Sequence, residues 1–91
     1  MIELIWDNQF KKNFKKWKKS HPDLIVKFSE KILDFEKDPF APSLKTHPLK
    51  GKLHGLWSFS LSYDYRIVFE FIDEEKTRAL LIKIGTHDQV Y

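Results

Sequence analysis

Five residues of this 91-residue chain are of types that could carry out catalysis together: His47, Asp64, Arg66, His87 and Tyr91. Cleavage of RNA by its own 2′-hydroxyl needs a base for that hydroxyl, an acid for the leaving 5′-oxygen and a cation that holds the charge on phosphorus. Two histidines and an arginine can supply these roles, and a tyrosine can stack on a splayed base. The set therefore predicts RNA cleavage without a metal or a cofactor.

Each of these residues also has an ordinary structural interpretation. The histidines could lie on the surface, Asp64 could form a turn, and Tyr91 could pack the tail of the chain. Arg66 could form an ion pair with Asp64 or Glu70. The chemistry therefore depends on whether the fold gathers these residues on one surface.

The arginine lies in a stretch, Leu56–Phe71, whose alternation of apolar and polar residues predicts a β-hairpin. The apolar residues of both arms can share a face only if Leu61 lies opposite Ile67, with a three-residue loop at 63–65. That register places Arg66 across from a serine. The predicted buried face comprises Trp57, Phe59, Leu61, Ile67, Phe69 and Phe71, and the other face comprises Ser58, Ser60, Ser62, Arg66, Val68 and Glu70.

Two amphipathic helices are predicted before the hairpin. A short strand at 2–6 leads into a helix that Asp7 or Asn8 can cap, and Ser20 can cap a second helix. Apolar residues spaced by three and four mark the buried stripe of each helix. These are Phe10, Phe14 and Trp17 in the first helix, and Ile25, Phe28, Ile32 and Phe35 in the second.

The rest of the chain is predicted to be a long loop at 38–55 and a last strand at 77–84. In that strand Leu80, Ile82 and Ile84 are expected to face the core, which leaves Ala79, Leu81 and Lys83 beside the arginine. We therefore expect a single α+β domain, residues 1–91. Its two-helix hairpin packs on a small antiparallel sheet in the order β-α-α-β-β-β.

The positive charge is concentrated in the first half of the chain, although the net charge is only +3. Residues 1–50 carry eleven lysines against seven acidic residues. Six of these lysines lie on the first helix with no acid between Phe10 and Ser20, which fits either a solvated face or an electrostatic footprint for nucleic acid. The candidate RNA-binding residues are Lys15, Lys16, Lys50, Lys52, Ser60 and Lys83.

The composition argues against several other classes of protein. Without cysteine there is no disulfide framework and no thiolate metal site, and the four histidines lack the spacing of metal ligands. The N-terminal residues are too short and too acidic a stretch for a signal peptide, and no segment is long and apolar enough to span a membrane. We expect a cytoplasmic protein with no metal, no cofactor and no membrane partner.

Taken together, the motifs of the second half resemble the RelE/ParE superfamily of bacterial toxins. The order H-P-L-K-G, W-S-F-S-L, Y-R-I-V-F-E and the final I-G-T-H-D-Q-V-Y is most similar to the RelE and YafQ-like ribosome-dependent mRNA interferases. The resemblance implies a microbial-RNase-like fold and cleavage of mRNA in the ribosomal A site. It also implies neutralisation by an antitoxin encoded alongside.

The resemblance also assigns roles to the five residues. His47 stands where relatives have a catalytic histidine or glutamate, and Asp64 matches the aspartate of the YafQ-like hairpin. Arg66 matches the arginine that grips phosphate. His87 matches the histidine of the Gly-Thr-His tail, and Tyr91 matches the terminal aromatic that stacks on or orients the substrate.

The chain departs from these relatives at Ser60, where the YafQ-like branch has another histidine. RelE-like relatives also carry more lysine and arginine, and Lys50 and Lys52 can supply part of that charge. Two other interpretations remain open: a ParE-like toxin that inhibits DNA gyrase without cutting RNA, and a plain RNA-binding module.

The expected protein partners are the ribosome and the cognate antitoxin. Val68 and Leu81 would form an exposed apolar pair rimmed by Lys83, Lys15 and Lys16, which suits an acidic, amphipathic antitoxin segment. The alternative is that the protein's own 38–55 loop covers the apolar pair.

Overall fold

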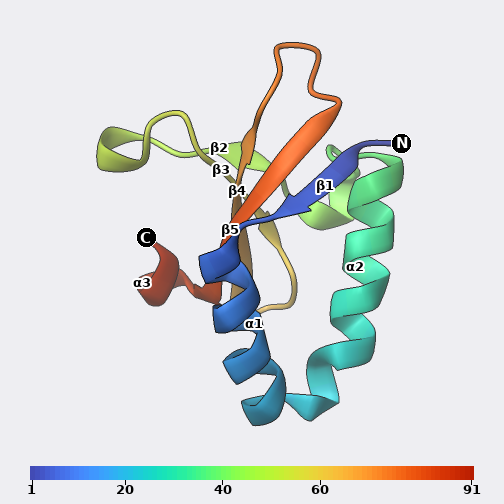
Figure 1. Cartoon of the computed structure of the whole chain (residues 1–91), viewed down its shortest axis with the longest axis vertical. Helices are drawn as coiled ribbons and strands as arrows, with labels where there is room; N and C mark the ends of the chain where they lie inside the picture. Colours follow the sequence, from blue (N-terminus) through green and yellow to red (C-terminus); the bar gives the residue numbers. More distant parts are fainter.

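A five-stranded sheet forms the centre of the molecule (Figure 1). The computed structural model describes all residues from Met1 to Tyr91. The strands are β1 (Glu3–Trp6), β2 (His47–Pro48), β3 (Trp57–Ser60), β4 (Tyr65–Phe71) and β5 (Arg78–Thr86), and the helices are α1 (Asn8–Ser20), α2 (Ile25–Lys37) and α3 (His87–Val90). None of the helices has the length and apolar content needed to cross a lipid bilayer.

The strand order is β1-β5-β4-β3-β2, and every neighbouring pair is antiparallel except β1 with β5, which is parallel. The predicted α+β class and the pair of helices are confirmed. The expectation of a purely antiparallel sheet is wrong. The edge strand β1 runs parallel to its neighbour β5, which is the last strand in the sequence. Two short elements, β2 and α3, were not predicted.

Both long helices pack on the same face of the sheet. Phe10 and Trp17 of α1 and Phe35 of α2 are buried in one cluster with the inward side chains of β3, β4 and β5. The Phe35 ring lies 4.5 Å from Phe59 and 4.8 Å from Phe69, measured between ring centroids. Each such buried phenylalanine contributes about 1.5–3 kcal/mol to stability, so the predicted helical stripes hold the sheet in place.

The helix boundaries follow local capping in one case and not in the other. Asp7 caps α1 by accepting a hydrogen bond of 2.9 Å from the backbone N–H of Gln9, as predicted. Ser20 does not cap α2. It is the last residue of α1, and a turn of 3-10 helix at Pro22–Leu24 precedes α2.

The β3–β4 hairpin forms with a register that differs by two residues from the prediction. Phe59 lies opposite Ile67, and Arg66 lies opposite Ser60 rather than Ser62. The loop is longer because the backbone N–H groups of Leu61 and Ser62 both donate to the carbonyl of Tyr65. A shift by two leaves the two faces unchanged, so the buried set of the hairpin is still largely the predicted one.

A register shift between Val68 and Phe69 changes the faces of β5. Val68 lies opposite Lys83 but Phe69 lies opposite Leu81, so Ile82 is the extra residue of a bulge. Ala79 and Leu81 are therefore buried in the core, and the prediction that Leu80 and Ile82 occupy it is wrong. Ile84, beyond the bulge, faces the core as predicted.

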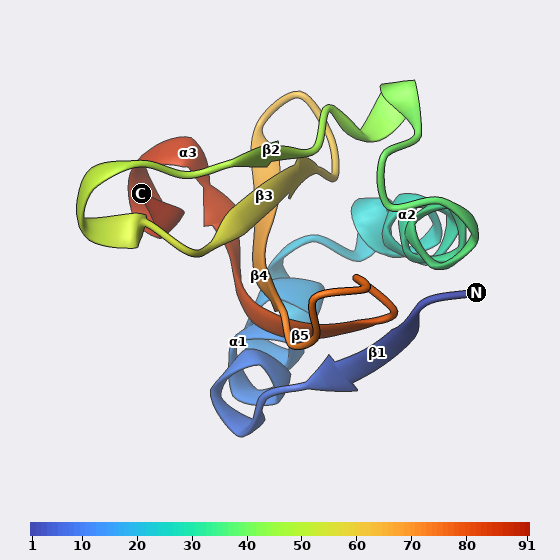
Figure 2. The ribbon, with the colours of Figure 1, turned by 90° about the horizontal axis from the view of Figure 1, so that it is seen from above.

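Residues of the loop and the tail cover the opposite face of the sheet (Figure 2). Leu49 and Val90 pack with Val68 in a second buried cluster, and Val68 is only 1% exposed. Because Leu81 is also buried, the two do not form an exposed apolar pair, and that expectation for antitoxin docking is wrong. Leu49 of the loop and Val90 of the tail cover Val68, whereas Leu81 lies in the main core on the opposite face.

The turn between β4 and β5 is held by Asp73. Its carboxylate accepts hydrogen bonds from the Thr77 hydroxyl and from the backbone N–H groups of Thr77 and Arg78. These bonds, the Thr77 hydroxyl foremost, favour the charged form and lower the pKa of Asp73 from 3.8, although desolvation acts against them.

We predict that Asp73→Asn lowers the melting temperature at pH 7 by a few degrees. A carboxyl with a lowered folded-state pKa stabilises the protein fully above its unfolded pKa, and the contribution is lost as the pH falls through the folded value. The difference between wild type and variant should therefore shrink below about pH 3.8. Thermal unfolding across pH measures this, with Glu75→Gln in the same turn as the control.

Candidate active site on the outer face of the sheet

The face of the sheet opposite α1 and α2, called the outer face below, carries most of the candidate residues. His47 on β2 pairs with Ser58 on β3, and Ser60 pairs with Arg66 on β4. Residues that pair directly across a sheet project from the same face. The fold therefore places His47 and Arg66 on one surface, although they come from separate strands.

The C-terminal segment folds back onto this face. Thr86 caps α3 with a reciprocal capping box to Gln89, and Val90 is buried against Val68. Gly85 allows the close return, because a Cβ there would lie 2.9 Å from the Gln89 side-chain oxygen. The sequence Gly-Thr-His thus sets His87 at the first position of α3, at the rim of the outer face.

Tyr91 and Ser58 link the tail to the centre of the sheet. The Tyr91 hydroxyl donates a hydrogen bond of 2.5 Å to Ser58 Oγ, and Ser58 is fully buried. The Tyr91 ring meets the edge of the His87 ring, with centroids 4.4 Å apart. His47, Ser58, Tyr91 and His87 therefore form a row along the outer face, in which His47 neighbours Ser58 by strand pairing and the other three are joined by side-chain contacts.

His47 is oriented by its own loop. Its Nδ1 lies 2.9 Å from the carbonyl oxygen of Lys45. A carbonyl can only accept, so Nδ1 carries the proton and Nε2 of the neutral ring keeps a free lone pair. This tautomer can act as a base. The only polar contact of the His87 side chain is a long one, 3.5 Å, with the carboxylate of Asp88, and this side chain is 69% exposed.

The Arg66 side chain turns toward the hairpin loop. One terminal nitrogen donates to the carbonyl oxygens of Ser62, Tyr63 and Tyr65, at 2.8 to 3.2 Å. No acidic residue pairs with the guanidinium, so the ion pair with Asp64 or Glu70 is absent. The hairpin carbonyls fix the guanidinium, and its remaining N–H groups are free to meet an anion.

Three lysines that the sequence did not assign to the site surround Arg66. Lys27, Lys31 and Lys45 line the same pocket of about 320 Å³, and no acidic residue lines it. Lys27 and Lys31 are four residues apart on one helix, a spacing that places them on the same helical face. That spacing was a usable signal, but only the fold shows that this end of α2 approaches the hairpin.

The other predicted residues lie outside this group. Asp64 is exposed in the hairpin loop and makes no hydrogen bond or ion pair through its side chain. Lys50 and Lys52 lie on the exposed loop that follows β2, and Lys15 is exposed on α1. Ser60 lines the Arg66 pocket, whereas Lys16 and Lys83 line a different pocket between α1 and α3.

Comparison with known proteins decides the family. Residues 6–87 match the model of the YoeB-like toxin of bacterial type II toxin-antitoxin system. The chain belongs to this family of YoeB-like toxins. Toxin YoeB of Escherichia coli K12 is 29% identical over 73 residues, which span 80% of this chain and 87% of that protein. The predicted RelE/ParE superfamily is confirmed, and the YoeB-like branch is the one identified.

Solved structures support the fold. A copper-bound mutant toxin from Helicobacter pylori covers all of both chains with a TM-score of 0.79 at 26% identity. A YoeB-YefM complex from Staphylococcus aureus has a TM-score of 0.71 at 16% identity and covers 96% of this chain and 98% of that one, which shows the fold alone. As a YoeB-like toxin of a type II system, this chain has an antitoxin as its partner.

Proposed function

We propose that this YoeB-like toxin inhibits translation by cutting translated mRNA on the ribosome, through attack of the RNA 2′-hydroxyl on the adjacent phosphate. The observation that carries the proposal is the row in which His47 pairs with Ser58 across β2 and β3, and contacts lead from Ser58 through Tyr91 to His87. It brings two proton-transfer groups, one from the middle and one from the end of the sequence, to the face from which Arg66 also projects.

In this proposal the roles are divided among separate groups. His47 Nε2 takes the proton from the 2′-hydroxyl, and His87 donates a proton to the leaving 5′-oxygen. The guanidinium of Arg66 stabilises the additional charge on phosphorus. Tyr91, held by Ser58, orients the substrate. Asp64 retains only the role that the family resemblance gives it, since no contact joins it to the others.

The lysines around Arg66 extend the proposed RNA path toward α2. Four cations without acidic partners repel one another, and the phosphates of an RNA strand would relieve this repulsion. Lys50 and Lys52 lie on the loop after β2, on the other side of His47 in the sequence. These two lysines would extend the RNA path along that loop.

A substitution at Lys31 tests this path. Lys31→Gln should weaken binding to programmed ribosomes and lower the slope of log affinity against log salt by about one, because one phosphate contact is lost. The matched control is Lys37→Gln on the same helix, which lies outside the pocket. Equal slopes for the two variants would remove Lys31 from the RNA path.

The function itself is tested in a purified translation system. The toxin is added to translating ribosomes, and the ends of the mRNA are mapped by primer extension. We expect new ends within the translated region and none when ribosomes are omitted. Intact mRNA together with altered supercoiling of plasmid DNA would contradict the proposal and support the gyrase alternative.

A further inference from the structure

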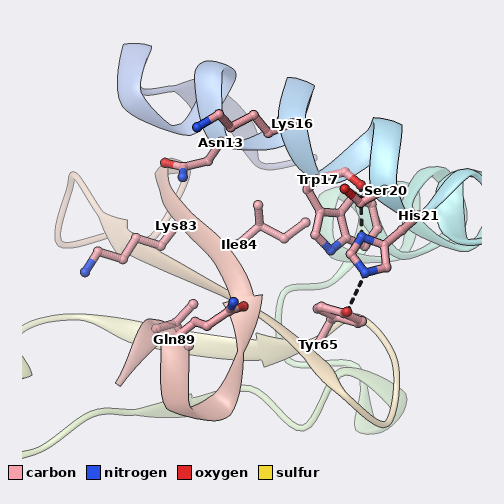
Figure 3. Close-up of a pocket in the computed structure, with 10 residues that line it drawn as sticks. Asn13, Lys16, Trp17, Ser20, His21, Tyr65, Lys83, Ile84 and Gln89 are labelled. Atoms are coloured by element: carbon pink, nitrogen blue, oxygen red, sulfur yellow. Dashed lines mark hydrogen bonds between the residues drawn. The ribbon is translucent and has the colours of Figure 1, made fainter.

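A second pocket lies between α1 and α3, over the end of β5 (Figure 3). Its volume is about 410 Å³. Figure 3 shows Lys16, Asn13 and Lys83 extending to one side and Trp17, Ser20 and His21 on the other, with Ile84 between them. The complete lining is Asn13, Lys16, Trp17, Ser20, His21, Tyr65, Lys83, Ile84, Gln89 and Val90.

The floor of this pocket holds an unpaired donor. Trp17 is only 7% exposed, and its Nε1 is the one buried side-chain nitrogen or oxygen without a hydrogen-bond partner. In Figure 3 the indole nitrogen is directed between the side chains of Ile84 and Tyr65. A buried N–H without an acceptor costs free energy, so an acceptor would be favoured at Nε1 if the side chains that shield this atom from solvent move aside on binding.

The aromatic rings around Trp17 leave no stacking platform. The centroid of the His21 ring is stacked at 5.1 Å from the indole centroid, and the Tyr65 ring packs edge-on with its centroid at 5.6 Å. His21 is fixed in turn by hydrogen-bond contacts from its Nδ1 to the Trp17 carbonyl and from its Nε2 to the Tyr65 hydroxyl. Single-stranded RNA is usually held by bases stacked on exposed aromatic faces. This pocket offers none, so its geometry favours a peptide over RNA.

The charge around the pocket favours an acidic peptide. Lys16 and Lys83 are exposed, no acidic residue lines the pocket, and no lysine of the chain forms an ion pair. The adjoining helix carries five more lysines between Phe10 and Ser20 and no acid. A carboxylate is complementary to two ammonium groups and can also accept from the indole N–H.

We propose that this pocket receives an acidic side chain from the antitoxin segment that neutralises the toxin. The carboxylate lies between Lys16 and Lys83, and the aliphatic stem of the acidic side chain packs on Ile84 and Val90. When the side chains that cover Trp17 Nε1 move aside, the carboxylate accepts a hydrogen bond from it. The proposal rests on the role of the chain as a toxin with an antitoxin. Antitoxin binding is measured without any cleavage, so it can fail or succeed independently of the proposed nuclease activity.

The test compares two variants with the same change of net charge. Lys16→Gln with Lys83→Gln removes the two ammonium groups at the pocket, and Lys11→Gln with Lys12→Gln removes two from the same helix outside it. The affinity for the antitoxin encoded beside the toxin is measured by calorimetry. We expect the pocket variant to bind about 30-fold more weakly than wild type, and the control to bind within about threefold. Equal losses would overturn the proposal, because only general charge would then matter.

Two further measurements separate the remaining outcomes. Trp17→Phe removes the donor and keeps an aromatic ring, so a variant that is folded at the assay temperature should lose about fivefold in antitoxin affinity, although the smaller ring leaves a cavity in the core and lowers the melting temperature. Undiminished affinity in that folded variant would overturn the role of the indole. If the variant does not fold, the lysine comparison decides.

The second measurement is the ribosome affinity of the pocket lysine variant. A loss of ribosome affinity that equals its loss of antitoxin affinity would mark the pocket as an RNA surface and overturn the proposal.

Discussion

His87→Ala should lower the rate of mRNA cleavage by about 10²–10⁴-fold, the usual effect of removing a general acid or base. His87 is exposed at the start of α3, and its side chain makes only the long contact with Asp88 and the edge contact with Tyr91. Removing the imidazole should therefore leave the melting temperature nearly unchanged. Cleavage is measured as a single-turnover rate on translating ribosomes.

The control for His87 is another exposed histidine of the same protein. His54→Ala lies on the loop before β3 and makes no side-chain hydrogen bond, so its cleavage rate should match that of wild type. A folded His87→Ala variant that cuts mRNA as fast as His54→Ala would remove His87 from the mechanism.

Arg66→Ala should lower the cleavage rate by about 10²–10³-fold, and Arg66→Lys by less, because a cation fixed beside the reacting phosphate is lost or made flexible. The structure adds a second effect. The guanidinium donates to three carbonyls of the hairpin loop, so Arg66→Ala should also lower the melting temperature.

The cleavage rate per folded molecule and the melting temperature distinguish these effects at Arg66. Arg78→Ala, at the chain's other arginine, serves as the control. Arg78 is exposed on β5, so its loss should change neither the rate nor the melting temperature much. A lower melting temperature for Arg66→Ala with an unchanged rate per folded molecule would assign Arg66 to the hairpin alone.

The sequence predicted the helices well because their evidence is local. Phe28 and Phe35 are buried on α2 at the expected spacing, and Asp7 caps α1 through a contact two residues away. The two faces of the hairpin could be predicted for the same reason, since alternation over a few residues specifies which side chains share a face.

The register errors arose where several pairings satisfy the same pattern. A shift of two residues preserves the alternation of β3 and β4, so only the loop hydrogen bonds to Tyr65 select the observed register. Residues 79–82 are all apolar, so their pattern does not indicate which of them face the core. The bulge at Ile82 determines which ones are buried.

Contacts between distant residues could not be predicted from spacing at all. The Tyr65 hydroxyl lies 2.5 Å from Nε2 of His21, forty-four residues away in the sequence, and neither was expected to contribute to a pocket. The row through His47, Ser58 and Tyr91 was anticipated only in part. The residue types indicate its histidines and tyrosine, but the alternation of the strand places Ser58 only on a polar face.

The central proposal is that the RNA supplies its own nucleophile, and one substitution in the substrate tests it most directly. An mRNA is prepared with a single 2′-deoxynucleotide immediately 5′ of the mapped cleavage site, and translating ribosomes that carry it are treated with the toxin. We predict that the deoxy message stays intact at that position. The unmodified message should yield a 2′,3′-cyclic phosphate and a 5′-hydroxyl end. Cleavage of the deoxy message at the wild-type rate would contradict attack by the RNA 2′-hydroxyl.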